Sequence, residues 1–340
     1  MERSWARAHS FVKLTATELE WRVHAAFPDA VVLGVEPLKG GLRNSNYRLT
    51  LSGAPSCAVL RLYTADPEAC AREAGVLAAV AGRVPAPPIW HSEPGADPPF
   101  ALLELLEGGV MDEVVSAADA ATAVELAAGC GAALAVIHEI RFPAPGFLGP
   151  DLRVLRPMPA WAPTVLSALH GPAGERLGPE LADEVRRSVE SNALSAESVW
   201  SEAVLVHGDY KPWNLLVALP VAPAGPGELR PGGGDGLGRS ADADRPRLTG
   251  ILDWEFACAG SRLLDFATFL RDESTKPAGY GDAFASAYEA AGRVIPADWR
   301  RLMRVIDVLN LLQMLAWAQG AAAVTLRALI SAGLRETTTP

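Results

Sequence analysis

The distribution of apolar residues changes near Gly108, and this change limits the folds open to the chain. Before it, short runs rich in Val, Leu and Tyr are separated by Gly, Pro and Ser, a pattern typical of strands. These runs lie at 31–33, 47–51 and 58–62. After it, long alanine-rich stretches have helical spacing, most clearly 119–140 and 180–192. The sequence therefore predicts an α+β fold, with a sheet and one helix in residues 1–107 and a larger, mostly helical lobe in residues 108–340.

The helix expected in the first lobe begins near Asp66. The sequence Asp66-Pro67-Glu68 supplies a helix N-cap, a proline at the first helical position and an early carboxylate. Apolar residues then continue at helical spacing as far as Ala81. A last apolar run, residues 100–108, ends at glycines and predicts the strand by which the chain leaves the first lobe.

Charge and cysteine content narrow the classes of function and location. The chain has 340 residues, 49% of them apolar, and a formal net charge of −10. This charge disfavours a broad nucleic-acid surface but allows a local acidic cleft for a cationic ligand. The four cysteines have no metal-site spacing and are interpreted as reduced residues of a cytoplasmic protein. Residues 308–326 carry no formal charge, but Asn310 and Gln313 interrupt them, which predicts a buried helix and no membrane span.

Residues 219–247 differ in composition from the rest of the chain. They contain five prolines and seven glycines among 29 residues, with few clustered apolar side chains. Such a segment does not offset the entropy of ordering itself, which predicts a flexible surface insertion. The apolar runs on either side, 215–217 and 248–252, are expected to pair as a β-hairpin.

The strongest functional motif is residues 207–214, with the sequence HGDYKPWN, between two short apolar runs. A loop between strands that offers an Asp and, five residues on, an Asn is typical of enzymes that orient a hydroxyl nucleophile and bind Mg²⁺. In this interpretation Asp209 is the catalytic base or orienting carboxylate and Asn214 is a metal ligand. A turn or a helix cap explains either residue alone, but not both at this spacing.

A second acidic residue, Asp253, follows the strand predicted at 248–252. Mg²⁺ prefers oxygen ligands and keeps waters and substrate phosphates in its shell, so one carboxylate and one amide oxygen suffice from the protein. Asp253 is therefore predicted to bind the metal together with Asn214. The chain contains no zinc-protease motif, nucleophile elbow, P-loop or dinucleotide-binding fingerprint.

The order of these motifs resembles that of the aminoglycoside phosphotransferase and choline kinase family, which shares the protein-kinase-like two-lobed fold. The resemblance runs from 40–47 (GGLRNSNY) to 265–267 (DFA) and covers most of the chain. It implies an N-terminal antiparallel sheet and transfer of the γ-phosphoryl group from ATP, or alternatively GTP, to a hydroxyl of a small molecule with Mg²⁺. It also implies that Asp265 caps a helix and braces the catalytic loop.

The resemblance assigns several residues to the nucleotide. Gly40, Gly41 and Asn44 correspond to the loop that covers the nucleotide, where glycine allows close backbone approach to phosphate. Arg61 stands in the place of the strand lysine that contacts the α- and β-phosphates, and Glu73 is its implied ion-pair partner. Arginine keeps the positive charge of that lysine but differs in reach and shape.

Three further positions complete the implied nucleotide site. Glu104 and Leu106 lie in the expected hinge, whose backbone meets the nucleotide base. Lys211 makes its loop more similar to the catalytic loop of protein kinases than to that of most small-molecule kinases, and is expected to touch the γ-phosphate.

The acceptor is left open by these residues. Antibiotics such as aminoglycosides, cyclic peptides and macrolides fit the chemistry as well as choline, homoserine or a methylthio-sugar does. Asp272 and Glu273 are candidates for binding the ammonium groups of a cationic acceptor, and a solvated helix end is the alternative. A nucleotide-binding interaction module without catalysis is the alternative of another class. The expected assembly is a monomer or homodimer that binds a small molecule, with no nucleic acid and no membrane.

Overall fold

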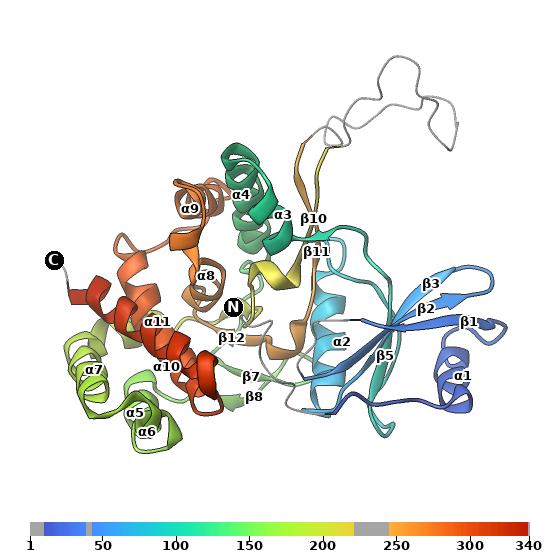
Figure 1. The fold of residues 1–340 in the computed structure, drawn as a ribbon, viewed down its shortest axis with the longest axis horizontal. Coiled ribbons are helices and arrows are strands. Elements are labelled where there is room, and N and C mark those ends of the chain that lie inside the picture. The colour runs from blue at the N-terminus through green and yellow to red at the C-terminus, as the bar shows by residue number, and fades with distance from the viewer. Residues whose placement is uncertain (1–9, 39–42, 221–244, 339–340) are drawn as a thin grey trace, which may run out of the picture.

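The computed structural model describes residues 10–38, 43–220 and 245–338. A sheet-rich part lies on one side of the molecule and a helical part on the other (Figure 1). The sheet-rich part contains five antiparallel strands in the order β1-β2-β3-β5-β4. Its strands are β1 (Val32–Pro37), β2 (Ser45–Leu51), β3 (Cys57–Leu62), β4 (Ile89–Glu93) and β5 (Phe100–Leu103). The predicted α+β arrangement with an N-terminal sheet is confirmed.

Two helices accompany this sheet, one of which the sequence analysis did not identify. This helix, α1 (Ala16–His24), begins with a capping box between Thr15 and Glu18 and packs Leu19 and Val23 on the sheet. The expected helix is α2 (Ala69–Val80), which begins after Glu68 and not at the predicted cap, Asp66. Asp66 Oδ1 instead accepts a hydrogen bond from the Glu68 N–H at 3.1 Å, in a turn that precedes the helix.

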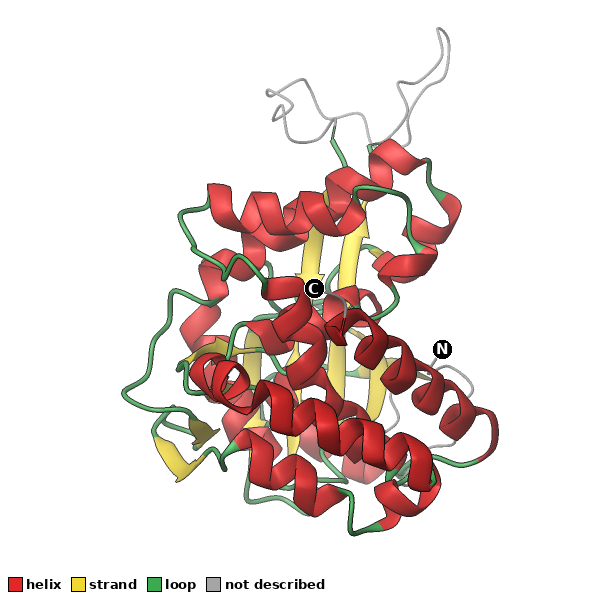
Figure 2. Cartoon of the chain, turned by 90° about the vertical axis from the view of Figure 1, so that its left-hand side faces the viewer, coloured by secondary structure: helices red, strands yellow, loops and turns green. Residues whose placement is uncertain are grey.

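The helical part covers most of the chain after residue 108, and Figure 2 shows its helices in front of the strands. Its helices are α3 (Met111–Ala117), α4 (Ala120–Ile137), α5 (Trp161–Ala168), α6 (Pro172–Leu177), α7 (Pro179–Trp200), α8 (Leu263–Leu270), α9 (Tyr280–Ala290), α10 (Trp299–Leu315) and α11 (Gly320–Thr338). The prediction of a single buried helix at 308–326 is wrong, because the helix is interrupted. Helix α10 ends at Leu315 and α11 begins at Gly320, whose φ is +54°. Among the described helices only α4 is long and apolar enough to cross a membrane, and 44% of this helix is buried inside the structure.

Two small sheets lie between these parts and carry the predicted motifs. The first has the order β11-β10-β6 and the second the order β8-β7-β12-β9. Their strands are β6 (Gly109–Val110), β7 (Gly146–Leu148), β8 (Val154–Pro157), β9 (Val204–Val206), β10 (Leu215–Ala218), β11 (Arg247–Ile251) and β12 (Cys258–Gly260). The predicted hairpin is confirmed, since β10 and β11 pair antiparallel from Leu215–Ile251 to Ala218–Arg247. Residues 221–244 of the expected insertion lie outside the described residues.

The main apolar core does not divide at the boundary between the two parts. Val76 and Leu77 of α2 and Leu103 of β5 belong to the same buried cluster as Leu126 and Phe266 of the helical part. A smaller cluster lies between α1 and the sheet. Helix α2 is therefore packed into the helical part, and it faces the turn that follows β11 (Figure 1).

Candidate active site

The loop 207–214 is held by a buried strand on its N-terminal side. All three residues of β9 are buried, and the chain turns at Gly208, whose φ is +81°. A Cβ atom at this position would lie 2.5 Å from the Phe256 carbonyl oxygen, so both the backbone conformation and the space require glycine. The motif's second residue thus allows the loop to pass against the segment that follows Asp253.

Asp265 fixes the backbone of this loop. Its carboxylate is fully buried in the first turn of α8 and accepts hydrogen bonds from the N–H groups of His207 and Gly208 at 2.8 and 2.9 Å. The ring of His138, at the end of α4, approaches the same carboxylate with Nε2 at 3.1 Å. The expected brace is confirmed. The expected helix cap is wrong, since α8 has no side-chain cap and the carboxylate is directed at the loop.

Three of the predicted residues meet within this loop. Lys211 Nζ lies 2.9 Å from Asp209 Oδ2, and Asn214 Nδ2 donates to the same oxygen at 2.8 Å. A short 3₁₀ helix, Pro212–Asn214, shapes the chain so that Asn214 turns back to Asp209. The Asp209 carboxylate is 17% exposed and is held by these two donors. With the amide nitrogen directed at Asp209, the amide oxygen is the end of Asn214 that can face a cation.

The hairpin brings the second motif beside this loop. The Leu252 N–H donates to the Asn214 carbonyl oxygen at 2.8 Å, and His207 Nε2 lies 3.0 Å from the Leu252 carbonyl oxygen. Asp253 follows with φ 68° and ψ 60°, a left-handed conformation that is uncommon for residues other than glycine. This conformation turns the chain into a single 3₁₀ turn, η4 (Trp254–Phe256). Asn214 and Asp253 therefore lie at adjacent positions on the same ribbon.

Four charged side chains lie together around the turn that follows β11, and we call them the buried charge cluster. It consists of Arg61, Glu73, Asp253 and Glu255. Arg61 Nε lies 3.0 Å from Glu73 Oε2, Arg61 Nη2 bonds Asp253 Oδ1, and the same nitrogen is 3.9 Å from Glu255 Oε1. Burial alone would lower the pKa of Arg61, but the carboxylates raise this pKa well above its usual value. Burial alone would raise the pKa of Asp253, and Arg61 instead holds it below its usual value.

Glu255 is a member of this cluster that the sequence analysis missed. Its side chain is buried, and burial together with the charge of Asp253 raises its pKa to about 7. Asn44 Nδ2 donates to Glu255 Oε2 at 2.9 Å, and Arg43 Nε lies 3.7 Å from Oε1. Glu255 thus ties the end of the loop that begins at Gly40 and Gly41 to the turn that carries Asp253. Gly40 and Gly41 themselves lie outside the described residues.

The donor atoms at this site suit Mg²⁺. Among the described residues no group of three or more His, Cys, Asp or Glu side chains is arranged to hold a metal ion by itself. Asn214 offers an amide oxygen and Asp253 its carboxylate oxygens, and Mg²⁺ takes few protein ligands when phosphates and waters complete its shell. The side chain of Asp253 is 29% exposed, so it remains open to solvent on one side. The residues present fit a magnesium ion bound together with a phosphate ligand.

The fold and these motifs agree with a known family. The model of the phosphotransferase enzyme family (APH) matches residues 34–227 and 241–304, more than half of the chain. The chain belongs to this family. It is a phosphotransferase. A search of curated proteins found no match.

Solved structures show the same protein-kinase-like fold. Aminoglycoside phosphotransferase APH(4)-Ia is 14% identical, with a TM-score of 0.64 over 96% of this chain and 100% of that chain. APH(2")-IIa in complex with gentamicin is 15% identical, with a TM-score of 0.58 over 97% of this chain and 98% of that chain. Macrolide 2'-phosphotransferase MphH from Brachybacterium faecium is 20% identical, with a TM-score of 0.55 over 90% of this chain and 96% of that chain.

In the phosphotransferase, the two expected hinge residues follow β5. The Glu104 N–H donates to the Pro88 carbonyl oxygen at 2.9 Å, so this N–H is already occupied. Leu106 packs on β11, where a Cβ on Gly250 would lie 3.0 Å from its Cδ1. The chain leaves the sheet here and enters the helical part through β6 and α3.

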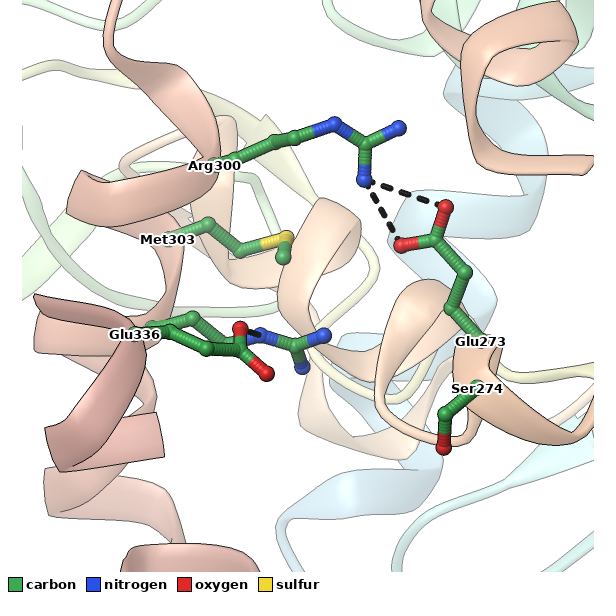
Figure 3. Close-up of a pocket in the computed structure, with 6 residues that line it drawn as sticks. Glu273, Ser274, Arg300, Met303 and Glu336 are labelled. Atoms are coloured by element: carbon green, nitrogen blue, oxygen red, sulfur yellow. Dashed lines mark hydrogen bonds and ion pairs between the residues drawn. The ribbon is translucent and has the colours of Figure 1, made fainter. Parts of the chain in front are cut away.

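The two acceptor candidates of the phosphotransferase lie at the far end of α8. Glu273 lies in the 3₁₀ turn Glu273–Thr275. Arg300 Nη1 donates to both carboxylate oxygens of Glu273, at 2.7 and 3.0 Å, across a pocket of about 240 Å³ (Figure 3). The pocket is lined by Glu273, Ser274, Arg300, Met303, Arg304 and Glu336. Because Arg300 compensates the charge of Glu273, this carboxylate is a poor partner for an ammonium group. Asp272 lies beside it, and its carbonyl oxygen accepts from Thr275.

Proposed function

We propose that this phosphotransferase is an ATP-dependent kinase that transfers the γ-phosphoryl group to a hydroxyl of a small molecule, with Asp209, Asn214 and Asp253 as the central residues. The observation that carries the proposal is the contact of Asp209 with both Lys211 and Asn214, in a loop whose last residue is hydrogen-bonded to Leu252. Acid–base, phosphate-binding and metal-binding groups thus share one rigid ribbon, and phosphoryl transfer depends mainly on such positioning.

Asp209 orients the acceptor. Its carboxylate accepts the proton of the attacking hydroxyl while the hydroxyl oxygen forms a bond to the γ-phosphorus. The bond between this phosphorus and the β–γ bridging oxygen breaks, and ADP leaves with the electron pair. Lys211, held 2.9 Å from Asp209, supplies positive charge at the transferred group.

The nucleotide is held from the other side of the site. Asn214 and Asp253 would bind Mg²⁺, which when bound neutralises charge on the β- and γ-phosphates. Arg61 contacts Asp253 and Glu73 and reaches the phosphates in place of a lysine. Structures of similar fold that contain AMP-PNP or ADP support nucleotide binding by this protein.

The proposed acceptor is an antibiotic of the aminoglycoside or macrolide kind, and the proposed location is the cytoplasm. Proteins of similar fold have been solved with hygromycin B and gentamicin, and another is a macrolide phosphotransferase. The four free cysteines support a reducing compartment.

An ADP-release assay over aminoglycosides, macrolides, peptide antibiotics and amino alcohols, with and without Mg²⁺, tests this function. We expect Mg²⁺-dependent turnover with one acceptor class, and Asp209→Asn should lower kcat by about 100-fold or more without changing nucleotide affinity. The matched control is Asp183→Asn, which alters an exposed ion pair on α7 and should leave kcat unchanged. Equal turnover by Asp209→Asn and wild type would contradict the assignment of Asp209.

A further inference from the structure

Arg72 bonds the backbone of the turn η4. It lies on α2, one residue before Glu73, and its side chain is 17% exposed. Its Nε and Nη2 both donate to the Glu255 carbonyl oxygen, at 3.2 and 2.9 Å. Nη2 also lies 2.7 Å from Asp66 Oδ2. The forked guanidinium thus places two donors on a single carbonyl oxygen, which a lysine does not reproduce.

The turn that receives these bonds needs external support. Asp253 at its start has φ 68°, a conformation that L-residues keep only where the surrounding structure holds them. The turn itself has only three residues, and the Ala257 N–H closes it by donating to the Trp254 carbonyl oxygen. Such a short element does not fix the direction of Asp253 by its own hydrogen bonds.

Helix α2 supplies this support through two consecutive residues. Glu73 Oε1 accepts a hydrogen bond from the Trp254 N–H at 3.1 Å, at the start of the turn. Arg72 holds the Glu255 carbonyl oxygen one residue further along. The helix is itself anchored by Val76, which is buried in the main core. Helix α2, which is fixed in the core, therefore binds both a backbone donor of the turn, the Trp254 N–H, and a backbone acceptor, the Glu255 carbonyl oxygen. We call these two contacts the clamp.

We propose that Arg72 is a positioning residue for Asp253: by holding the Glu255 carbonyl, it keeps the Asp253 carboxylate directed at the metal-binding position beside Asn214. The proposal rests on the proposed function, because it takes Asp253 as a Mg²⁺ ligand. Groups that orient the ligands of a metal affect metal affinity although they do not touch the ion. Loss of Arg72 therefore weakens Mg²⁺ binding and leaves the acid–base chemistry of Asp209 in place.

The test compares Arg72→Met and Arg72→Lys with two controls. Asp66→Asn removes the carboxylate partner of Arg72 but leaves its bonds to Glu255. Arg83→Met removes an exposed arginine that pairs with Glu139. Hydrogen exchange of the amides of residues 254–257 is measured in the metal-free and nucleotide-free protein, and the Mg²⁺ concentration for half-maximal turnover is measured in the assay.

For Arg72→Met we expect about tenfold faster exchange at residues 254–257 and about a tenfold higher Mg²⁺ requirement, with kcat at saturating Mg²⁺ within about twofold of wild type. Arg72→Lys should fall between Arg72→Met and wild type, and both controls should match wild type. Unchanged exchange and an unchanged Mg²⁺ requirement in Arg72→Met would overturn the inference. Faster exchange spread over the whole sheet and α2 would also overturn it, since Arg72 would then stabilise the fold in general.

Failure of the proposed function gives a different result. Asp253→Ala should abolish binding of Mg²⁺–ATP in calorimetry. If this variant binds Mg²⁺–ATP like wild type, Asp253 is not the metal ligand and the positioning role is overturned with it. The exchange data on Arg72→Met then still report whether the clamp on η4 exists, because they require neither metal nor nucleotide.

Discussion

The buried charge cluster and the charged pocket beside α10 contain the same kinds of side chains in different proportions. In the cluster, one arginine, Arg61, serves three carboxylates and is 9% exposed. At the pocket, Arg300 is 41% exposed and pairs with Glu273 and Asp282, while Arg304 pairs with Glu336. In the first group three of the four side chains are buried and negative charge is in excess, whereas in the second group each ion pair has a partner, such as Arg300 or Glu336, that is well exposed to water.

The difference indicates where a cation is needed. Solvent reaches Arg300 and Glu336, which are 41% and 60% exposed, so the ion pairs of the pocket contribute little and need no ligand. In the buried charge cluster the negative excess is relieved either by a proton, as the pKa of about 7 at Glu255 shows, or by a bound cation. Imbalance of buried charge, more than pocket volume or the number of ion pairs, therefore favours the buried charge cluster as part of the proposed site.

Removing the single cation of the buried cluster should have the largest effect. Arg61→Met removes the cation that contacts Glu73 and Asp253, and we expect a loss of about 3–5 kcal/mol in the free energy of unfolding. Urea denaturation at pH 8 measures it, with Arg61→Lys as the control that keeps the charge and should lose less. A loss below about 1 kcal/mol would show that water reaches the cluster as it reaches Arg300, and the contrast between the two groups would disappear.

Glu255 should make the stability of the metal-free protein depend on pH. Its pKa is raised from 4.5 to about 7 by burial and by Asp253, with Glu73 adding to the rise and Arg61 and Asn44 opposing it. Because the folded protein holds this proton more tightly than the unfolded chain, its contribution to stability is full below pH 4.5 and is lost as pH rises towards 7.

Glu255→Gln removes this loss, since the amide has no proton to release. The free energy of unfolding of the variant relative to wild type should therefore rise by about 2 kcal/mol between pH 5 and pH 8. Urea titrations at four pH values in that range measure it, with Glu273→Gln at the pocket beside α10 run in parallel as the matched control. A flat difference for Glu255→Gln would mean that Glu255 is ionised throughout.

Arg300→Met should have the smallest effect of the three. Because the pair is half-exposed, we expect a change of no more than about 1 kcal/mol in the free energy of unfolding and an unchanged kcat/KM for the acceptor. Arg186→Met, which removes an exposed pair on α7, is the control. A rise of tenfold or more in the acceptor KM at unchanged stability would place the pocket in the acceptor site and restore Glu273 as a substrate-binding residue.

The fold and the centre of the site were predictable because their signals are local. The runs 215–217 and 248–252 are apolar and flank a segment of foreign composition, which predicts the observed β10–β11 hairpin. Once these strands pair, Asn214 and Asp253 must lie side by side. The helix α1 was also readable, since Thr15 and Glu18 form a capping box, but it was not identified.

Neither the contact of Arg72 with η4 nor the ion pair of Glu273 could be predicted from neighbouring residues in the sequence. Arg72 bonds a backbone carbonyl 183 positions away, and any residue type can supply such an acceptor. The partner of Glu273 lies 27 positions away on a different helix. The cap predicted at Asp66 was wrong for a different reason. The Asp66 side chain accepts a hydrogen bond from the N–H of Glu68, two residues on, and so closes a turn that precedes the helix. Such contacts depend on how elements pack, which spacing along the chain does not encode.

The hairpin also makes the chain tolerant of added length. Its strands pair from Leu215–Ile251, next to the site, to Ala218–Arg247 at the opposite end, about 10 Å away along the ribbon. Ala218 and Arg247 therefore lie at the end of the hairpin that is remote from Asn214 and Asp253. A fluorescent protein or an affinity tag inserted between these two residues would be attached directly to the β10–β11 hairpin without changing the pairing of its strands. This connection is therefore a suitable attachment point for a reporter on the enzyme.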